Sequence, residues 1–402
     1  MKNLLIILFI VLTIWACGDA EEPISFALQN EYETAYELET LGDAQHIYVN
    51  DSLLLVAQGR GGFSVWNVEN INSTKPSLIK NVGGDLFRYI NNRITLVRDT
   101  VALLTYNQQT QEYEVFSEQG ETFVVASAQT FGIEAVPLDA CCLNDTIEYT
   151  ESEYNSSRID FSAGPTGFPK PVIYDVFTRT ITKTFSDSLI FPPELFTYAF
   201  IAAGEKGVIV RDFNLINNAI SKIWEIQLSG HTEGIKLVGD SLIYCANEEA
   251  GFQIASAVLD YDSLASEHSF RTNVYGGVDT DGAATKLVVA DEGKYVYIAD
   301  ENGGIAIVRV DNINSPELVK SISTDDSAND IAIDEANNKI FVANDDEGLF
   351  IYDISDRENP VLTDRFQFGP SGNEYKVASV TFYKGLIFAA TENGGVKILR
   401  RK

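Results

Sequence analysis

The sequence predicts an all-β chain that folds into a single β-propeller of four-stranded blades, and three observations support this prediction. The first is a β-hairpin unit that recurs six times: an apolar strand, a polar turn that ends in glycine, and a β-branched strand. The second is the spacing of these units, which is typical of propeller blades. The third is the near absence of helical periodicity, which argues against a helical solenoid. We expect eight blades, with seven as the alternative.

Residues 1–16 are predicted to be a lipoprotein signal peptide. Lys2 gives a short positive region, and residues 4–15 form an apolar run that is shorter than a membrane span. The run ends at Ile14-Trp15-Ala16-Cys17, which resembles the lipobox of bacterial lipoproteins, so Cys17 is the predicted lipidation site. An ordinary secretory signal is the alternative.

Residues 17–34 are predicted to form an acidic tether. The acidic residues directly after Cys17 resemble the surface-export signals of some double-membraned bacteria. We therefore expect an outer-membrane lipoprotein that faces the cell exterior, with the periplasmic face as the alternative.

The blade count follows from the glycine that precedes the second strand of each hairpin. These marker glycines are Gly62, Gly207, Gly251, Gly304, Gly348 and Gly395. Their successive separations are 145, 44, 53, 44 and 47 residues, so the first interval has room for two degenerate units. Segments 93–106 and 158–176 have the strand and turn composition of such units, which brings the count to eight.

Further strands flank each hairpin, for example at residues 330–334 and 361–366, and complete a four-stranded blade. The last unit lacks a fourth strand, and Ala35–Leu41 is predicted to supply it. This pairing would close the ring and remove exposed sheet edges, so residues 35–402 are assigned to one propeller. Residues 135–163 fit no strand pattern and are predicted to be an insertion.

Three segments resemble the LVIVD-repeat family of secreted propellers. They are residues 62–78, 304–318 and 348–362, and each has a proline, at Pro76, Pro316 and Pro360, in the turn before the outer strand. The resemblance implies a propeller fold and a secreted location. The family carries no agreed catalytic residues, so the resemblance implies none here.

The cysteines bear on the redox state. Without Cys17, the chain keeps Cys141, Cys142 and Cys245 in what we expect to be an oxidising compartment. An odd number leaves a free thiol or an intermolecular bond. A disulfide between the adjacent Cys141 and Cys142, or from one of them to Cys245, is compatible with the sequence.

The charge balance excludes one class of partner. The chain has 29 basic and 58 acidic residues and a formal net charge of −29, which repels phosphate backbones and anionic lipid surfaces. We therefore expect no nucleic acid as a partner, and contact with a membrane only through the lipid anchor.

A candidate ligand face follows from propeller topology, because the turns between second and third strands share a face with the connections between blades. The residues that we assign to this face are His46, His231, Glu233, Asp279, Asp281, Asp300, Glu301, Asp325, Asp326, Asp345, Asp346, Glu374 and Tyr375. Glu248 belongs to the same set of acidic turns. Converging carboxylates could hold calcium or a cationic partner, whereas the alternative is that hairpin turns simply favour acidic residues. Calcium is the candidate ion, and no other cofactor is expected.

Catalytic chemistry has little support in the sequence. His231 beside Glu233 could act as an acid or a base, His46 is expected near the channel mouth, and Tyr375 is a candidate platform for a sugar. No nucleophile elbow, Walker loop, dinucleotide fingerprint or zinc-protease helix is present, so no catalytic residue is assigned.

Three functions remain. The first, which we expect, is a binding scaffold that docks an envelope or extracellular protein or glycan on one propeller face. The second is a metal-dependent hydrolase or lyase with its site at the central channel. The third is a structural subunit of an envelope complex that makes contacts through the insertion and the unpaired cysteine.

Overall fold

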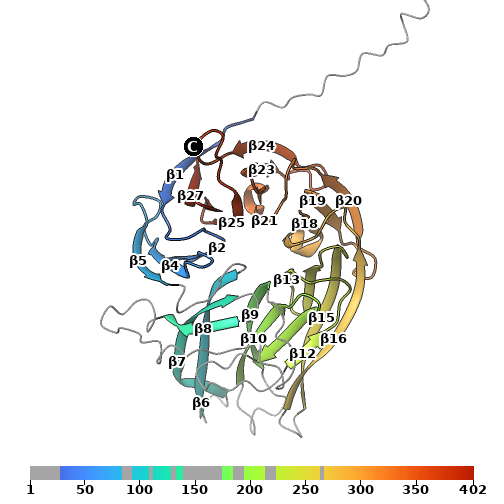
Figure 1. Cartoon of the computed structure of the whole chain (residues 1–402). Helices are drawn as coiled ribbons and strands as arrows, with labels where there is room; N and C mark the ends of the chain where they lie inside the picture. Colours follow the sequence, from blue (N-terminus) through green and yellow to red (C-terminus); the bar gives the residue numbers. More distant parts are fainter. Residues whose placement is uncertain are drawn as a thin grey trace, which may run out of the picture.

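The computed structural model describes residues 28–83, 93–107, 112–127, 133–138, 174–183, 194–212, 223–262 and 267–402. These residues form antiparallel sheets arranged around a common centre (Figure 1). None of the helices in these ranges is long and apolar enough to cross a membrane. The predicted signal peptide, Cys17, Cys141 and Cys142 lie outside the described residues.

The described strands make six four-stranded sheets and one three-stranded sheet. The first three sheets contain β2 (His46–Val49), β3 (Leu53–Ala57), β4 (Phe63–Asn67) and β5 (Ser77–Val82); β6 (Arg93–Asn107), β7 (Glu112–Ser127) and β8 (Ile133–Pro137); and β9 (Asp175–Lys183), β10 (Glu194–Ala202), β11 (Val208–Asp212) and β12 (Ile223–Ile226).

The next two sheets contain β13 (Gly234–Val238), β14 (Leu242–Ala246), β15 (Phe252–Asp262) and β16 (Glu267–Val278); and β17 (Lys286–Ala290), β18 (Tyr295–Ala299), β19 (Ile305–Arg309) and β20 (Glu317–Ile322). The last two contain β21 (Asp330–Asp334), β22 (Lys339–Ala343), β23 (Leu349–Asp353) and β24 (Val361–Phe366); and β25 (Val377–Tyr383), β26 (Leu386–Thr391), β27 (Gly395–Arg401) and β1 (Tyr32–Leu38). Short 3₁₀ helices, η3 (Asp291–Gly293) and η4 (Glu335–Asn337), join β17 to β18 and β21 to β22.

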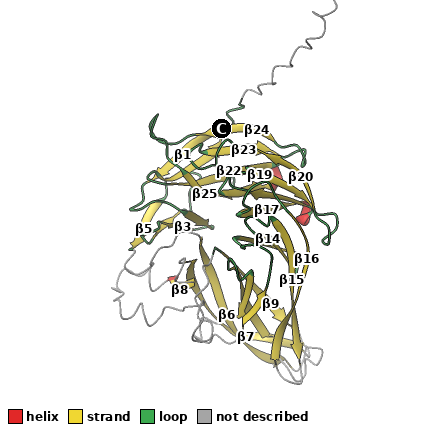
Figure 2. Cartoon of the chain, turned by 45° about the vertical axis from the view of Figure 1, so that its right-hand side comes forward, coloured by secondary structure: helices red, strands yellow, loops and turns green. Residues whose placement is uncertain are grey.

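The first strands of the sheets are the innermost ones. Each of β2, β6, β9, β13, β17 and β21 contacts the first strand of the following sheet, and β25 contacts β2. Figure 2 shows the sheets from a second direction, fanning out from this centre. The prediction of an all-β chain of four-stranded antiparallel units is confirmed, and the strands predicted at 330–334 and 361–366 coincide with β21 and β24.

Apolar side chains fill the space between neighbouring sheets. One cluster joins Ile305 and Ile307 of β19 to Ile340 and Phe350 of the next sheet. All five residues of β22 are buried, because both faces of the sheet are covered by neighbours. Each fully buried aliphatic or aromatic side chain contributes about 1.5–3 kcal/mol to folding.

The marker glycines have a common structural reason. All six have positive φ angles, between 68° and 92°. A Cβ at Gly348 would lie 2.1 Å from the carbonyl oxygen of Phe366 in β24, and a Cβ at Gly395 would lie 2.0 Å from that of Leu38 in β1. The glycine therefore permits the fourth strand to approach closely, and β1 occupies the fourth-strand position of its sheet.

The predicted pairing of an N-terminal strand with the last unit is present, with shifted bounds. β1 is antiparallel to β27, with Tyr32 opposite Arg401 and Leu38 opposite Val396. The strand covers residues 32–38 and not 35–41, so residues 32–34 belong to the sheet and not to the tether. Lys402 N also donates to the carbonyl of Glu31 at 2.8 Å.

The middle of the chain departs from the regular unit. The predicted strand at 93–106 is β6, which pairs with β7 in a hairpin whose strands have 15 and 16 residues. β8 includes residues 135–137, which the sequence predicts to belong to the insertion; they pair with β7. Residues 139–173, which contain the rest of the insertion and most of the predicted unit at 158–176, lie outside the described residues.

Candidate functional site

The turns between second and third strands meet the connections between sheets on one face, which we call the mouth face. In three successive sheets the second turn residue has a positive φ, of 43° at Glu248, 41° at Glu301 and 40° at Asp345. Glu248 and Glu301 form antiparallel bridges with Ala284 and Ala328 in the following connections, and Asp345 forms one with Val377 at the start of β25. Acidic turn residues and the connections therefore lie side by side, as the topology argument predicts.

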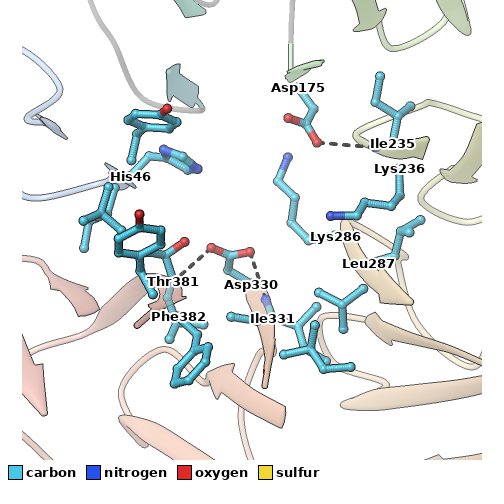
Figure 3. Close-up of a pocket in the computed structure, with 18 residues that line it drawn as sticks. His46, Asp175, Ile235, Lys236, Lys286, Leu287, Asp330, Ile331, Thr381 and Phe382 are labelled. Carbon is cyan, nitrogen blue, oxygen red and sulfur yellow. Dashed lines mark hydrogen bonds between the residues drawn. The ribbon is translucent and has the colours of Figure 1, made fainter. Parts of the chain in front are cut away.

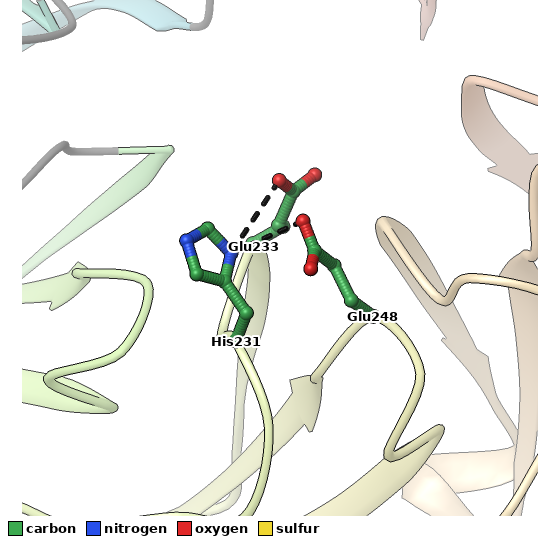
Figure 4. Close-up of side chains that lie close together, drawn as sticks. All are labelled: His231, Glu233 and Glu248. Atoms are coloured by element: carbon green, nitrogen blue, oxygen red, sulfur yellow. Dashed lines mark ion pairs between the residues drawn. The ribbon is translucent and has the colours of Figure 1, made fainter.

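A cluster of three metal-ligating side chains lies on the mouth face at the fourth sheet (Figure 4). His231 and Glu233 precede β13, and Glu248 belongs to the turn between β14 and β15. His231 Nδ1 is 3.2 Å from Glu248 Oε1 and 3.7 Å from Glu233 Oε1. The structure thus joins the pair singled out in the sequence to a carboxylate from the adjacent turn.

Local packing sets the orientation of the His231 imidazole. The ring packs edge-on against Tyr174, with the centroids 4.7 Å apart. On another side it lies against Gly204, where an added Cβ would be 2.6 Å from Nε2. Two backbone hydrogen bonds between Gly204 and Thr232 hold the segment that contains Gly204 against the segment that contains His231. Nδ1 is thereby held near the two carboxylates.

The electrostatics of the cluster are dominated by burial and by carboxylates. Burial and the hydrogen bond to Glu248 raise the pKa of Glu233 to about 8, with Lys286 acting in the opposite direction. Burial and the nearby carboxylates, Glu233 first among them, raise the pKa of Tyr174 to about 12. Lys286 Nζ donates to the backbone carbonyls of Glu233 at 2.9 Å and Tyr174 at 3.2 Å. A negative charge on Glu233 is therefore costly at this position, and a bound cation would stabilise it.

The cluster borders a cavity at the centre of the molecule. This mouth cavity has a volume of about 250 Å³, and Glu233, Lys286 and Glu301 are among its lining residues. A further cavity of about 310 Å³ lies along the innermost strands, lined by His46, Lys286 and Asp330 among others (Figure 3). Asp330 accepts hydrogen bonds from Ser379 Oγ at 2.6 Å and from Val380 N at 3.1 Å.

A second acidic cluster on the mouth face comprises Asp326, Asp345 and Asp346. Lys376 Nζ is 2.8 Å from Asp345 Oδ2 and 3.4 Å from Asp346 Oδ2. Asp346 N also donates to Asp326 Oδ2 at 3.1 Å. This cluster therefore has a cation supplied by the chain itself.

Not every acidic residue assigned to the ligand face is presented to solvent. Asp300 is buried, where it accepts hydrogen bonds from Thr280 Oγ1 at 2.6 Å and from Gly282 N at 2.8 Å. It holds the turn to the preceding connection and is not displayed on the mouth face. Asp279, Asp281 and Asp325, by contrast, are exposed.

The remaining candidates have local structural contacts. His46 is buried in β2, and its Nδ1 accepts a hydrogen bond from Ile94 N at 3.3 Å. Glu374 is exposed and accepts a hydrogen bond from Gly372 N at 2.8 Å.

Lys397 Nζ lies 5.7 Å from the centroid of the Tyr375 ring, so a cation already faces the proposed sugar platform. Tyr375 lines a side cavity of about 1080 Å³.

Cys245 is a free thiol that is wholly buried in β14. Its Sγ lies 3.7 Å from the carbonyl oxygen of Ile243, and burial raises the pKa of the thiol. Its surroundings are apolar side chains of two adjacent sheets.

Sequence reasoning missed Tyr174 and Lys286, which lie far from His231 along the chain. A signal for the site was nevertheless present in the repeats. Glu233 follows the bridged residue Thr232, and the corresponding positions in the next three sheets are Thr285, Asn329 and Ala378. An aligned set of repeats would have shown that, of these four sheets, only the one that begins with β13 carries a carboxylate there.

Comparisons with known proteins agree with this architecture. Residues 281–324 and 326–367 match the family model described as LVIVD repeat. These ranges contain two of the three segments that resemble the family, and residues 62–78 lie outside them. No curated protein matches the chain in sequence.

Solved structures with a similar fold include two β-propellers. The β-propeller domain of Cps50 (Swd1) from Myceliophteria thermophila has 11% identity and a TM-score of 0.54, covering 92% of this chain and 100% of that chain. The WD40 β-propeller domain of Doa1 has 12% identity and a TM-score of 0.54, covering 92% and 97%. At such identities the likeness concerns the fold alone. The protein therefore carries LVIVD repeats on a β-propeller fold.

Proposed function

We propose that the protein is a lipid-anchored binding module that presents its mouth face to a basic protein partner outside the cytoplasm. The observation that carries this proposal is the recurring bridge between acidic turns and the following connections. It places exposed carboxylates of successive sheets on one face, namely Glu249, Asp279, Asp281, Asp325 and Asp346. A rim of one charge sign attracts a partner of the opposite sign and sets its orientation.

The proposed scaffold is a closed ring of seven blades, the alternative to the eight that the spacing favoured. Contacts of β6 with both β2 and β9, and of β25 with β2, support this count. The fourth-strand position of β1 supports closure.

The proposed anchor is a lipid on Cys17, on the strength of the lipobox resemblance. Labelled palmitate should be incorporated into the full-length protein in a double-membraned bacterial host and not into Cys17→Ala. Degradation of the labelled protein by protease added to intact cells would support the outer surface. Degradation only after the outer membrane is opened would support the periplasmic alternative, and equal labelling of both proteins would overturn the anchor.

The binding proposal is tested with a fluorescent lysine dodecapeptide and the full-length protein in detergent. Asp281→Asn/Asp325→Asn removes two exposed charges from the mouth face and should weaken binding about fivefold, since each exposed pair contributes roughly 0.5 kcal/mol. The matched control, Glu292→Gln/Glu335→Gln, removes two charges from η3 and η4 at the other ends of the strands.

The control should bind within about twofold of the wild type. Equal weakening by both variants would mean that only net charge matters, and it would overturn the assignment of this face. Tighter binding of an uncharged oligosaccharide than of the peptide would instead identify a glycan partner and overturn the basic one.

A further inference from the structure

The His231 cluster has the dimensions of a metal site. Its three ligand atoms lie within 4.8 Å of one another, and Nδ1 is 3.2 and 3.7 Å from the two carboxylate oxygens. A zinc ion with bonds of 2.0–2.1 Å in tetrahedral geometry separates neighbouring ligand atoms by about 3.4 Å. The distances of 3.2 and 3.7 Å lie on either side of this value, so an ion fits with little movement.

The imidazole nitrogen that faces the carboxylates lies at ion-pair distance from both of them but makes no hydrogen bond. His231 Nδ1 is shielded from solvent and makes no hydrogen bond to any of the described residues, in spite of its short distance to Glu248. A buried nitrogen without a hydrogen bond normally costs free energy. Coordination to an ion would use its lone pair and relieve the repulsion between Glu233 and Glu248.

Comparison with the other sheets separates this cluster from the second acidic cluster. The residue before the bridged position is His231 in the fourth sheet and Lys376 in the last sheet. Lys376 supplies an ammonium to Asp345 and Asp346. His231 occupies the same position relative to its bridge, but it faces Glu248 in the turn of its own sheet, so this position holds an imidazole that can ligate a metal and not an ammonium.

The donor set selects the class of ion. One imidazole nitrogen and two carboxylates suit first-row transition metals such as zinc, whereas calcium prefers oxygen ligands only. Three protein ligands leave a coordination position for water or another ligand. Glu233 also lines the mouth cavity, so the ion would border that cavity.

We propose that His231, Glu233 and Glu248 bind a divalent transition-metal ion, with zinc as the best match. This site does not depend on the basic partner proposed above.

The test is calorimetric titration of ZnCl₂ and of CaCl₂ into the full-length protein, without a histidine tag and after removal of metals by EDTA. A single zinc ion should bind to the wild type, and calcium should bind at least a hundredfold more weakly. His231→Ala and Glu248→Gln should each weaken zinc binding at least tenfold. The half-exposed Glu248 makes the second variant the safer one for folding.

The control is Asp345→Asn/Asp346→Asn, which changes the cluster that Lys376 neutralises and should bind zinc within twofold of the wild type. Far-UV circular dichroism in EDTA verifies that each variant is folded. Visible absorption of bound Co²⁺ should be lost in His231→Ala. Zinc binding that is unchanged in both single variants, calcium binding as tight as zinc, or no zinc binding to the folded wild type would overturn the site.

Discussion

Asp300 illustrates why an acidic turn residue need not be a ligand. It is the first residue of its turn and points inward to Thr280 Oγ1 and Gly282 N. The corresponding position holds Asn247 and Asn344 in two other sheets, and both are buried. Asn247 accepts from Thr232 Oγ1 at 2.7 Å, so the same side chain position ties the turn to the preceding connection.

Burial raises the pKa of Asp300, which gives the fold a defined pH dependence. A carboxyl whose pKa is raised in the folded state stabilises the fold below its unfolded pKa, and this stability is lost as the pH rises through the folded pKa. Asp300→Asn removes this dependence. We expect the free energy of unfolding of the wild type to fall relative to the variant as the pH rises above 4.

Urea unfolding of both proteins between pH 4 and pH 8 measures this difference. At pH 7 the variant should lie within about 1 kcal/mol of the wild type, because the lost acceptor for Gly282 N opposes the removed buried charge. A difference between the two proteins that stays constant with pH would contradict the assignment.

Cys245 should be chemically inert in the folded protein. It is wholly buried and its thiol pKa is raised by burial, so little thiolate is available to react. We expect no labelling of Cys245 by a maleimide in native buffer and complete labelling in 6 M guanidinium chloride, as measured by mass spectrometry of peptides. Rapid native labelling would show that β14 opens readily.

At the residue scale the sequence predicted the kinds of side chain on the mouth face but not their orientation. Asp300 and Glu301 are adjacent and both acidic, yet the first is buried and the second lines the mouth cavity. The difference lies in the left-handed backbone of Glu301, which turn composition does not specify. His231 and Glu233 were recognised together, whereas Glu248 was recognised only as one acidic turn residue among several.

At the scale of the element, the marker glycine was the most informative residue, because its role is local. The glycine must accept a positive φ and the approach of the fourth strand at the same time. Both requirements act within one hairpin and the adjacent fourth strand, so a glycine recurs at this position in the sequence. Elements of unusual length leave no such trace, as the extended β6–β7 hairpin shows.

These two requirements can be separated by a pair of substitutions. Gly348→Ala adds a Cβ at a φ of 92° that would lie 2.1 Å from the Phe366 carbonyl oxygen. Gly385→Ala adds one at a φ of 82° with no other atom within 4 Å. We expect the second change to cost about 1 kcal/mol from backbone strain and the first to cost at least about 3 kcal/mol.

Thermal and urea unfolding of the two variants provides the measurement. Because the backbone strain is similar, the difference between them reports the clash with β24. Equal costs would mean that the fourth strand moves away freely, which would contradict the structural role of the close approach.

At the scale of the whole molecule, β1 should contribute much of the stability of the last sheet. Tyr32 and Leu38 are buried in two different core clusters, and the strand covers the edge of β27. Deletion of residues 28–41 should lower the free energy of unfolding by several kcal/mol, about 1.5–3 for each buried side chain, and should promote aggregation through the exposed edge.

A deletion of residues 18–27, which precede the described part of the chain, is the control for shortening. We expect its Tm to lie within about 2 °C of that of the wild type. An unchanged Tm in the longer deletion, measured by differential scanning calorimetry, would contradict the role of β1.

The fold class was predictable because it depends on a repeated local pattern, whereas the predicted number of units depends on an assumed strand length. The prediction of eight units assumes that strands keep a constant length in the interval between Gly62 and Gly207. The structure places strands of 15 and 16 residues in this interval, and these long strands support the proposed count of seven. Strand length depends on which neighbours cover the strand, and that information is not local in sequence.

The pairing of β1 with β27 also means that the order of the strands along the chain could be changed without changing the sheets. The backbone hydrogen bond from Lys402 N to the carbonyl oxygen of Glu31 holds the two ends of the described chain close together. A short flexible linker from residue 402 to residue 28, with new ends between Ser371 and Gly372, would give a circular permutant. Gly372 lies in an exposed turn between β24 and β25, where an added Cβ would meet no other atom within 4 Å. In that permutant β25, β26, β27 and β1 would follow one another, and all seven described sheets would then be contiguous in sequence.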